Sequence, residues 1–250
     1  MNDATVRIPV CWSSAQDTNV GMVRNVNEDS ILSQTETQLW AVADGMGGYE
    51  AGNVASELIV KTLSSVTVNP VLNELIDNVE DRLIDVNNRI REYADTTLDG
   101  RTIGSTVVTL IIKGQVGVCL WAGDSRLYRY RDYQLMQLSR DHSQVAELVM
   151  QGVISPDEAK NHPKSNIITR AIGASQDVCI DINVFSARIG DIFLLCSDGL
   201  YNMVAKDEII KTIAGMPIHQ AVGVLIQKAL DKGANDNVSV ILVKGEKGKL

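Results

Sequence analysis

The stretch Ser105–Leu138 has the sequence STVVTLIIKGQVGVCLWAGDSRLYRYRDYQLMQL, in which four short β-rich runs follow one another. The runs cover residues 105–112, 117–122, 127–131 and 133–138, and the pairs Lys113-Gly114, Gly123-Asp124 and Arg131-Asp132 separate them. Short runs of branched and aromatic residues between turn-forming residues are typical of strands joined as hairpins. The stretch therefore predicts an antiparallel meander in the middle of the chain.

Helical periodicity is present before and after this meander. Residues 51–63 carry a rough apolar stripe, and a longer helix is predicted after Asn69-Pro70, because apolar residues recur there at steps of three and four. These positions are Leu72, Leu75, Ile76, Val79, Leu83, Val86 and Ile90. Further helices are expected at 206–214 and 219–232, and strands at 6–13, 30–33, 39–43, 191–196 and 237–243. This order favours an α+β fold with helices packed outside antiparallel sheets over a Rossmann-type alternation.

Composition and charge exclude several classes of protein. A chain of 250 residues with 45% hydrophobic residues can bury one sizeable core, so a single domain over residues 1–250 is expected. The chain has 23 Lys and Arg against 31 Asp and Glu, which argues against nucleic acid as a partner. No apolar run approaches the ~20 residues that span a bilayer, so no membrane association is expected. The N-terminus has no secretory signal, and we expect a cytoplasmic protein.

The cysteines do not indicate disulfides or zinc. Cys11, Cys119, Cys179 and Cys196 are scattered, form no C-x-x-C pair and have no histidine at zinc-finger spacing. We expect them to be free thiols that are buried as small hydrophobic residues.

Acidic residues stand at or near the ends of four predicted strands, beside Gly or Asn. They are Asp44, Asp124, Asp198 and Asp236. Each one alone is best explained as a turn residue, because Asp and Gly both suit turns. Together they can instead meet at one edge of a sandwich, where cations would be needed to offset their repulsion. Carboxylates with a glycine carbonyl, and without His or Cys, are hard oxygen ligands that suit Mg²⁺, Mn²⁺ or Ca²⁺ rather than Zn²⁺.

The polar segment Arg24–Asp29, RNVNED, is a plain turn in isolation but has a second interpretation beside a metal site. The planar guanidinium of Arg24 can bind two phosphate oxygens. Glu28 and Asp29 can accept hydrogen bonds from metal-bound waters. Arg24 is therefore a candidate phosphate-binding residue.

A series of short motifs in order resembles the metal-dependent protein serine/threonine phosphatases of type 2C, in their compact bacterial form. The motifs are GMVRNVNEDS (21–30), VADGMGG (42–48), GST (104–106), WAGDSR (121–126), LSRDHS (138–143), HP (162–163), SDGL (197–200) and DNVSV (236–240). Each is weak alone, but their order along nearly the whole chain is specific.

The resemblance implies a four-layer α-β-β-α sandwich of two antiparallel sheets flanked by helix pairs, with a flap subdomain at about 141–173. It implies that Asp44 bridges two metal ions and that the Gly45 carbonyl completes the second site. Asp198 and Asp236 would hold the first ion, and Asp124 with Asp198 a third. Asn237, next to Asp236, is expected to support these ligands. The implied ions are Mn²⁺ or Mg²⁺.

The implied activity is hydrolysis of phosphoserine and phosphothreonine on proteins by a metal-activated water, with Asp44 and Arg24 as catalytic residues. The chain would act as a monomer that reverses a bacterial Ser/Thr kinase, with that kinase and its substrates as partners. Tyr49 stands where bacterial members often carry a histidine, so either Tyr49 or a metal-bound water would protonate the leaving alkoxide. The alternatives are a catalytically silent module that binds phosphoproteins, and a binding domain merely stabilised by Ca²⁺ or Mg²⁺.

Overall fold

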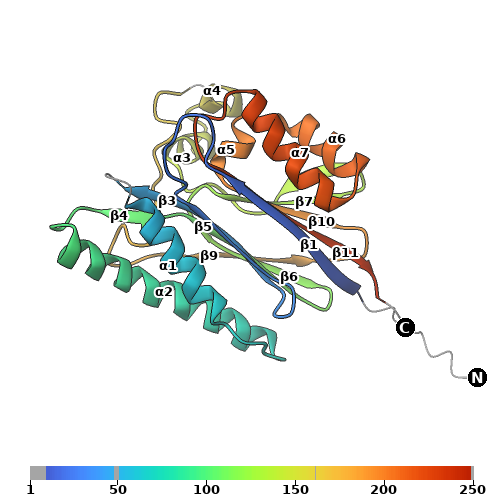
Figure 1. The fold of residues 1–250 in the computed structure, drawn as a ribbon, viewed down its shortest axis with the longest axis horizontal. Coiled ribbons are helices and arrows are strands. Elements are labelled where there is room, and N and C mark those ends of the chain that lie inside the picture. The colour runs from blue at the N-terminus through green and yellow to red at the C-terminus, as the bar shows by residue number, and fades with distance from the viewer. Residues whose placement is uncertain (1–9, 48–50, 161, 249–250) are drawn as a thin grey trace, which may run out of the picture.

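Two antiparallel sheets lie face to face between two pairs of helices in the computed structural model, which describes residues 10–47, 51–160 and 162–248 (Figure 1). The first sheet has the order β1 (Val10–Asn19), β11 (Val238–Lys247), β10 (Ile192–Cys196), β7 (Arg126–Arg131) and β8 (Gln134–Gln137). The second has the order β2 (Asp29–Gln34), β3 (Leu39–Gly47), β5 (Val107–Lys113), β6 (Val116–Ala122) and β9 (Asp181–Ser186), and β4 (Ile103–Ser105) pairs with β3.

Each sheet is covered on its outer face by one helix pair. Helices α1 (Gly52–Ser64) and α2 (Leu72–Thr97) pack on the second sheet, and α6 (Lys206–Gly215) and α7 (Ile218–Asp231) pack on the first. The shorter helices are α3 (Gln144–Met150), α4 (Pro156–Lys160) and α5 (Asp198–Tyr201). A third hydrophobic cluster fills the space between the sheets. The four layers therefore enclose three apolar cores.

The residues of β5 and α2 show why these layers form. Along β5, Val107 and Ile111 face the α1–α2 core while Val108 and Leu110 face the core between the sheets. A strand that is covered on both faces is apolar on both faces, which explains the nearly continuous apolar run in the sequence. The apolar stripe of α2 is buried, and Val79 within it has no exposed surface.

The predicted sandwich is confirmed, and the differences are local. The first strand runs over Val10–Asn19 where the prediction was 6–13, and residues 6–9 of that prediction lie outside the described part. β9 was not predicted; it is an edge strand whose Ile182 and Val184 face outward. The short α5 was also missed. No helix within the described ranges is both long enough and apolar enough to cross a membrane.

The prediction for the cysteines was half right. Cys119 and Cys196 are free and fully buried in β6 and β10, but Cys11 and Cys179 are exposed. Cys11 lies on the outermost strand of the first sheet, and Cys179 lies in the irregular chain before β9. Neither residue is covered by protein on both sides, as a residue of a central strand is.

Candidate metal and phosphate site

The four strand-end aspartates come from both sheets. Asp44 lies near the end of β3, and Asp124 lies in the turn between β6 and β7. Asp198 lies two residues after β10, at the start of α5, and Asp236 lies shortly before β11. β10 and β11 are neighbours, and the β6–β7 turn joins the two sheets. The topology therefore brings all four residues to one end of the sandwich, as the convergent interpretation of the sequence predicted.

The electrostatics of the site show that these carboxylates affect one another. Burial, followed by the charges of Asp29, Asp198, Asp124 and Asp236, raises the pKa of Asp44 well above its ordinary value. Burial and the charges of Asp124 and Asp236 raise the pKa of Asp198 to about 7. The pKa of Asp124 rises to about 6, mainly through burial and then through Asp141. Desolvated like charges of this kind are costly unless a cation offsets them.

Among the described residues, three buried carboxylate oxygens of this cluster have no hydrogen-bond partner: Asp29 Oδ1, Asp124 Oδ1 and Asp198 Oδ1. Buried polar atoms are normally paired, and unpaired carboxylate oxygens at one place suit hard divalent cations. Within the described residues, no three His, Cys, Asp or Glu side chains already form a group that could hold a metal ion. Repulsion among the carboxylates opposes such a group, and hard cations also take carbonyl and water ligands. The donor set therefore fits Mg²⁺ or Mn²⁺.

Arg24 faces the acids from the loop between β1 and β2. Its Nη2 donates to Asp236 Oδ2 at 2.8 Å, and half of its side chain is exposed. The hydrogen bond to Asp236 and the charge of that residue raise the pKa of the guanidinium. Arg24 thus keeps its charge and has an accessible side, as a phosphate-binding arginine requires.

Asn237 fixes the Arg24 loop. Its Nδ2 donates to the carbonyls of Val20 and Val26 at 2.9 and 3.1 Å, and its Oδ1 accepts from the backbone N–H of Glu28 at 2.8 Å. The amide side chain is buried and makes all three bonds to backbone. Asn237 therefore supports the site by holding the loop, from a position beside Asp236.

Glu28 and Asp29 have partners within the chain. Glu28 Oε1 accepts from the N–H of Gly52, the first residue of α1, at 2.8 Å, so it caps that helix. Asp29 lies opposite Asp44 on the neighbouring strand, and Ser197 Oγ donates to its Oδ2 at 2.7 Å. Burial raises the pKa of Asp29 to about 6. Their contact with metal-bound waters stays a prediction.

The backbone at Asp44 is held tightly. Ser105 Oγ and the N–H of Thr106 each donate to the Asp44 carbonyl at 2.9 Å. A Cβ on Gly45 would lie 2.2 Å from the Gly52 carbonyl oxygen, so only glycine fits there. The motif GST at 104–106 thus positions Asp44, a role that the sequence alone did not indicate.

The sequence did not predict the side chains that hold Asp124 in place. Tyr201 Oη donates to the Asp124 carbonyl at 3.0 Å, and the Arg126 guanidinium lies 3.5 Å from the centre of the Tyr201 ring. Arg126 in turn binds Asp141 through Nε and Nη2. Tyr201 follows the motif SDGL directly, but nothing in the sequence indicates its contact with residue 124.

His142 has a structural role. Its Nδ1 accepts from the N–H of Gly123 at 3.1 Å, its ring stacks on Trp121, and its Nε2 lies 3.2 Å from Asp181. Burial lowers the pKa of the ring, which favours the neutral form that can accept at Nδ1. His142 therefore fixes the turn that carries Asp124. Tyr49, the candidate proton donor, lies outside the described residues.

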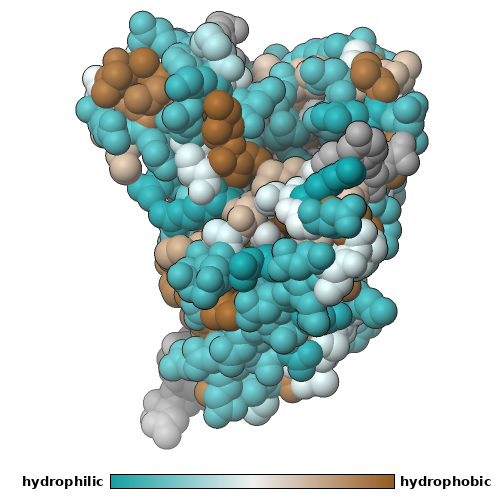
Figure 2. Space-filling model, turned by 90° about the vertical axis from the view of Figure 1, so that its left-hand side faces the viewer, coloured by the Kyte–Doolittle hydropathy of each residue, from teal (hydrophilic) through white to brown (hydrophobic). Residues whose placement is uncertain are grey.

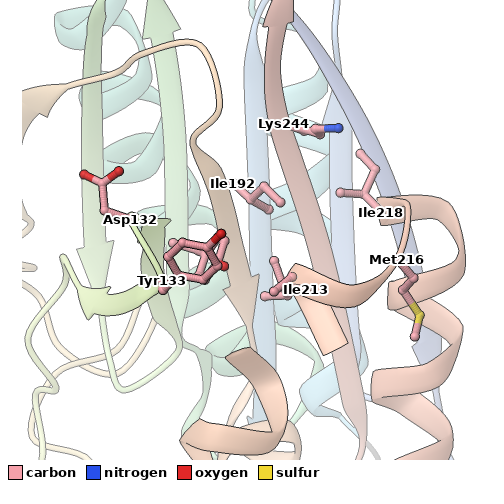
Figure 3. Close-up of a pocket in the computed structure, with 9 residues that line it drawn as sticks. Asp132, Tyr133, Ile192, Ile213, Met216, Ile218 and Lys244 are labelled. Carbon is pink, nitrogen blue, oxygen red and sulfur yellow. The ribbon is translucent and has the colours of Figure 1, made fainter. Parts of the chain in front are cut away.

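A separate cavity of about 370 Å³ lies at the other end of the first sheet, by the first residue of β10, Ile192 (Figure 3). Tyr133, Ile192 and Ile213 are grouped there, and Asp132 is turned away. The lining contains none of the residues predicted for the metal and phosphate site.

Three comparisons place this geometry among known proteins. The model of the protein family described as "Protein phosphatase 2C" matches residues 23–232 of this chain. The serine/threonine phosphatase stp of Listeria monocytogenes is 37% identical over 235 residues, which are 91% of this chain and 93% of that protein. The solved structure of PppA, a key regulatory component of T6SS in Pseudomonas aeruginosa, has 39% identity and a TM-score of 0.88 over 96% of this chain and 100% of that chain. The catalytic domain of PstP in complex with 2 manganese ions has 31% identity and a TM-score of 0.87 over 95% of this chain and 100% of that chain.

Proposed function

The chain belongs to the protein phosphatase 2C family, and from this premise we propose which of its residues carry out the reaction. It is a metal-dependent serine/threonine protein phosphatase that uses manganese. This activity, rather than silent phosphoprotein binding, agrees with the retained acids and with the accessible guanidinium of Arg24.

The proposed ligands of the metal ions are Asp44, the Gly45 carbonyl, Asp198 and Asp236, with Asp124 and Asp198 for a third ion. The observation that carries this assignment is the set of buried, mutually repelling carboxylates with unpartnered oxygens at one end of the sandwich. Mn²⁺ or Mg²⁺ would both suit these oxygen ligands. Asp44 would hold metal together with these residues, because its carboxylate lies close enough to the other acids of the cluster for their charges to raise its pKa.

When bound, the cations supply a water of lowered pKa and positive charge beside the phosphate. Arg24 binds the phosphate oxygens through the part of its guanidinium that Asp236 leaves accessible. Asn237 keeps the Arg24 loop in place, and Ser105 and Thr106 keep Asp44 in place. The chain thus positions the ester between a fixed guanidinium and fixed carboxylates. No side chain is required as a nucleophile.

We also propose the setting in which the enzyme acts. Its substrates would be proteins phosphorylated by a Ser/Thr kinase, including the kinase itself, and it would act as a single-domain cytoplasmic monomer without nucleic acid or membrane partners. The acidic net charge of −8 supports the exclusion of nucleic acid. The segment 141–173, which carries α3 and α4, is proposed as a flap beside the site, because Asp141 at its base binds Arg126 next to Asp124.

The test is release of phosphate from a phosphothreonine peptide. We expect activity that EDTA abolishes and Mn²⁺ restores, and loss of activity in Asp44→Asn with unchanged circular dichroism. Asp81→Asn, an exposed residue on α2, is the matched control and should keep full activity. Full turnover by Asp44→Asn, or by a metal-free preparation, would contradict the assignment.

A further inference from the structure

A groove of about 340 Å³ begins on the strand that carries Asp44. One side is Met46 of β3, and the other is the chain between residues 168 and 179. We call it the Met46 groove. Its apolar lining residues are Met46, Ile168, Ala171, Ala174, Val178 and Cys179. The other lining residues are polar, among them Arg170 and Asp177. The side of the molecule at which β3 ends has a mainly hydrophilic surface with separate hydrophobic groups, and the Met46 groove brings several apolar side chains together beside polar ones (Figures 1 and 2).

Buried hydrogen bonds hold the groove open in one shape. The backbones of Ser105 and Ile172 exchange two bonds of 2.9 Å. Asn87 of α2, which is buried, accepts from the N–H of Gly173 at 2.7 Å and donates to the Ser175 carbonyl at 3.1 Å. The irregular segment is therefore tied to β4 and α2, and a ligand would not have to order it.

The groove is close to the reacting centre. Met46 follows Asp44 by two residues on one strand, which corresponds to about 7 Å between their Cα atoms at the usual rise of a strand. A Cβ on Gly104 would lie 2.8 Å from the Ile172 carbonyl and 3.3 Å from Met46 Cε, so this glycine lets Met46 approach the segment. The groove thus continues the site in one direction.

We propose that the Met46 groove binds an apolar side chain of the substrate protein, two or three residues from the phosphorylated residue. This inference rests on the proposed function. An extended substrate has the same rise per residue as β3, so its second or third neighbour reaches the groove. Arg170 at the rim already donates to Asp181 Oδ1 at 2.7 Å, so it offers less charge to an acidic neighbour. The groove would make the enzyme prefer some phosphorylation sites over others.

The first test blocks the groove with Ala174→Trp. Gln176→Trp is the matched control, because Gln176 is exposed on the same segment but does not line the groove. The substrates are phosphothreonine peptides with Leu or Glu two or three residues away on either side, and p-nitrophenyl phosphate, which has no neighbours. We expect the wild type to prefer one Leu peptide at least tenfold in kcat/KM, since apolar pockets discriminate by about 10–200-fold.

Ala174→Trp should remove that preference and leave hydrolysis of p-nitrophenyl phosphate within twofold of the wild type, and Gln176→Trp should change neither. Equal rates for Leu and Glu peptides in the wild type, or equal losses on peptide and p-nitrophenyl phosphate, would overturn the proposal. A wild type that releases no phosphate from any of the phosphothreonine peptides would instead contradict the proposed function.

A second test needs no bulky substitution. Cys179 is exposed in the groove, while Cys119 and Cys196 are buried and Cys11 can be removed as Cys11→Ser. Alkylation of Cys179 with N-ethylmaleimide should lower kcat/KM for the preferred Leu peptide about tenfold and spare p-nitrophenyl phosphate. The double variant Cys11→Ser/Cys179→Ser should resist the reagent. Unchanged peptide kinetics after complete alkylation would overturn the proposal.

Discussion

Replacing Asp198 with asparagine should stabilise the metal-free protein and abolish its activity at the same time. Within the part of the chain that the structure describes, Asp198 Oδ1 is buried without a hydrogen-bond partner, and Oδ2 accepts one bond, of 3.2 Å, from Asn202 Nδ2. Asparagine keeps the shape of the side chain and removes its charge. The substitution therefore distinguishes the effect of Asp198 on cation binding from its effect on the stability of the fold.

The size of the effect follows from the raised pKa. The pKa of Asp198 rises from 3.8 to about 7 on folding. At 1.36 kcal/mol per pKa unit, burial of the charged carboxylate lowers the free energy of unfolding by about 4 kcal/mol at pH 8. A partly bonded buried asparagine has its own desolvation cost of about 1–3 kcal/mol. The net gain in free energy of unfolding is about 2 kcal/mol, which raises the Tm by about 4–8 °C for a chain of this size.

The gain in stability depends on pH, and its direction follows from the raised pKa of Asp198. The folded state binds the Asp198 proton more tightly than the unfolded chain, so this group stabilises the metal-free fold at low pH and loses that effect as the pH rises through about 7. At pH 5 the wild-type carboxyl is protonated in the folded state, and the asparagine variant has no advantage.

The assay is thermal denaturation in EDTA at pH 5 and pH 8, followed by circular dichroism. Asp81→Asn, on the exposed face of α2, controls for a general change in net charge and should behave as the wild type. Mn²⁺ should raise the Tm of the wild type more than that of Asp198→Asn. An asparagine variant that is no more stable than the wild type at pH 8, or is equally stabilised at both pH values, would show that the buried charge of Asp198 does not destabilise the metal-free fold.

Three further predictions follow from the contacts of the site. Arg24→Ala should raise KM about 10–100-fold with a smaller change in kcat, because it removes charged hydrogen bonds to the phosphate; a kcat-only effect in steady-state kinetics would contradict this. Gly45→Ala should lower the free energy of unfolding in urea by about 1–3 kcal/mol, since its Cβ would meet the Gly52 carbonyl; unchanged stability would show that the loop moves freely. Tyr201→Phe should weaken the lowest-affinity Mn²⁺ site measured by calorimetry and leave the tighter sites unchanged, because it removes the bond to the Asp124 carbonyl; identical binding isotherms would exclude this role.

The layers of the fold were predictable because their signals are local. The apolar stripe of α2 and the turn residues between β5 and β8 are read within windows of a few residues. β9 was not predictable in the same way, because its Ile182 and Val184 face solvent and its position depends on pairing with β6.

The candidate site residues could be named from the sequence, but the contacts that support them could not. The aspartates stand in turn motifs whose order resembles the family, although Asp44 and Asp198 are 154 positions apart and spacing alone cannot bring them together. The contacts that fix them are long-range: Ser197 reaches Asp29 across 168 positions, and Tyr201 reaches Asp124 across 77. Such partners depend on how the two sheets meet, which no local pattern encodes.

We propose that aspartates from both sheets hold divalent cations side by side. Electron paramagnetic resonance of the protein titrated with Mn²⁺ tests it most directly, because ions in a shared site lie about 3.5–4 Å apart and their spins couple. We predict a coupled spectrum in the wild type that Asp44→Asn loses and Asp81→Asn keeps. Only the six-line signal of isolated Mn²⁺ in the wild type, or a coupled spectrum that survives Asp44→Asn, would contradict the claim.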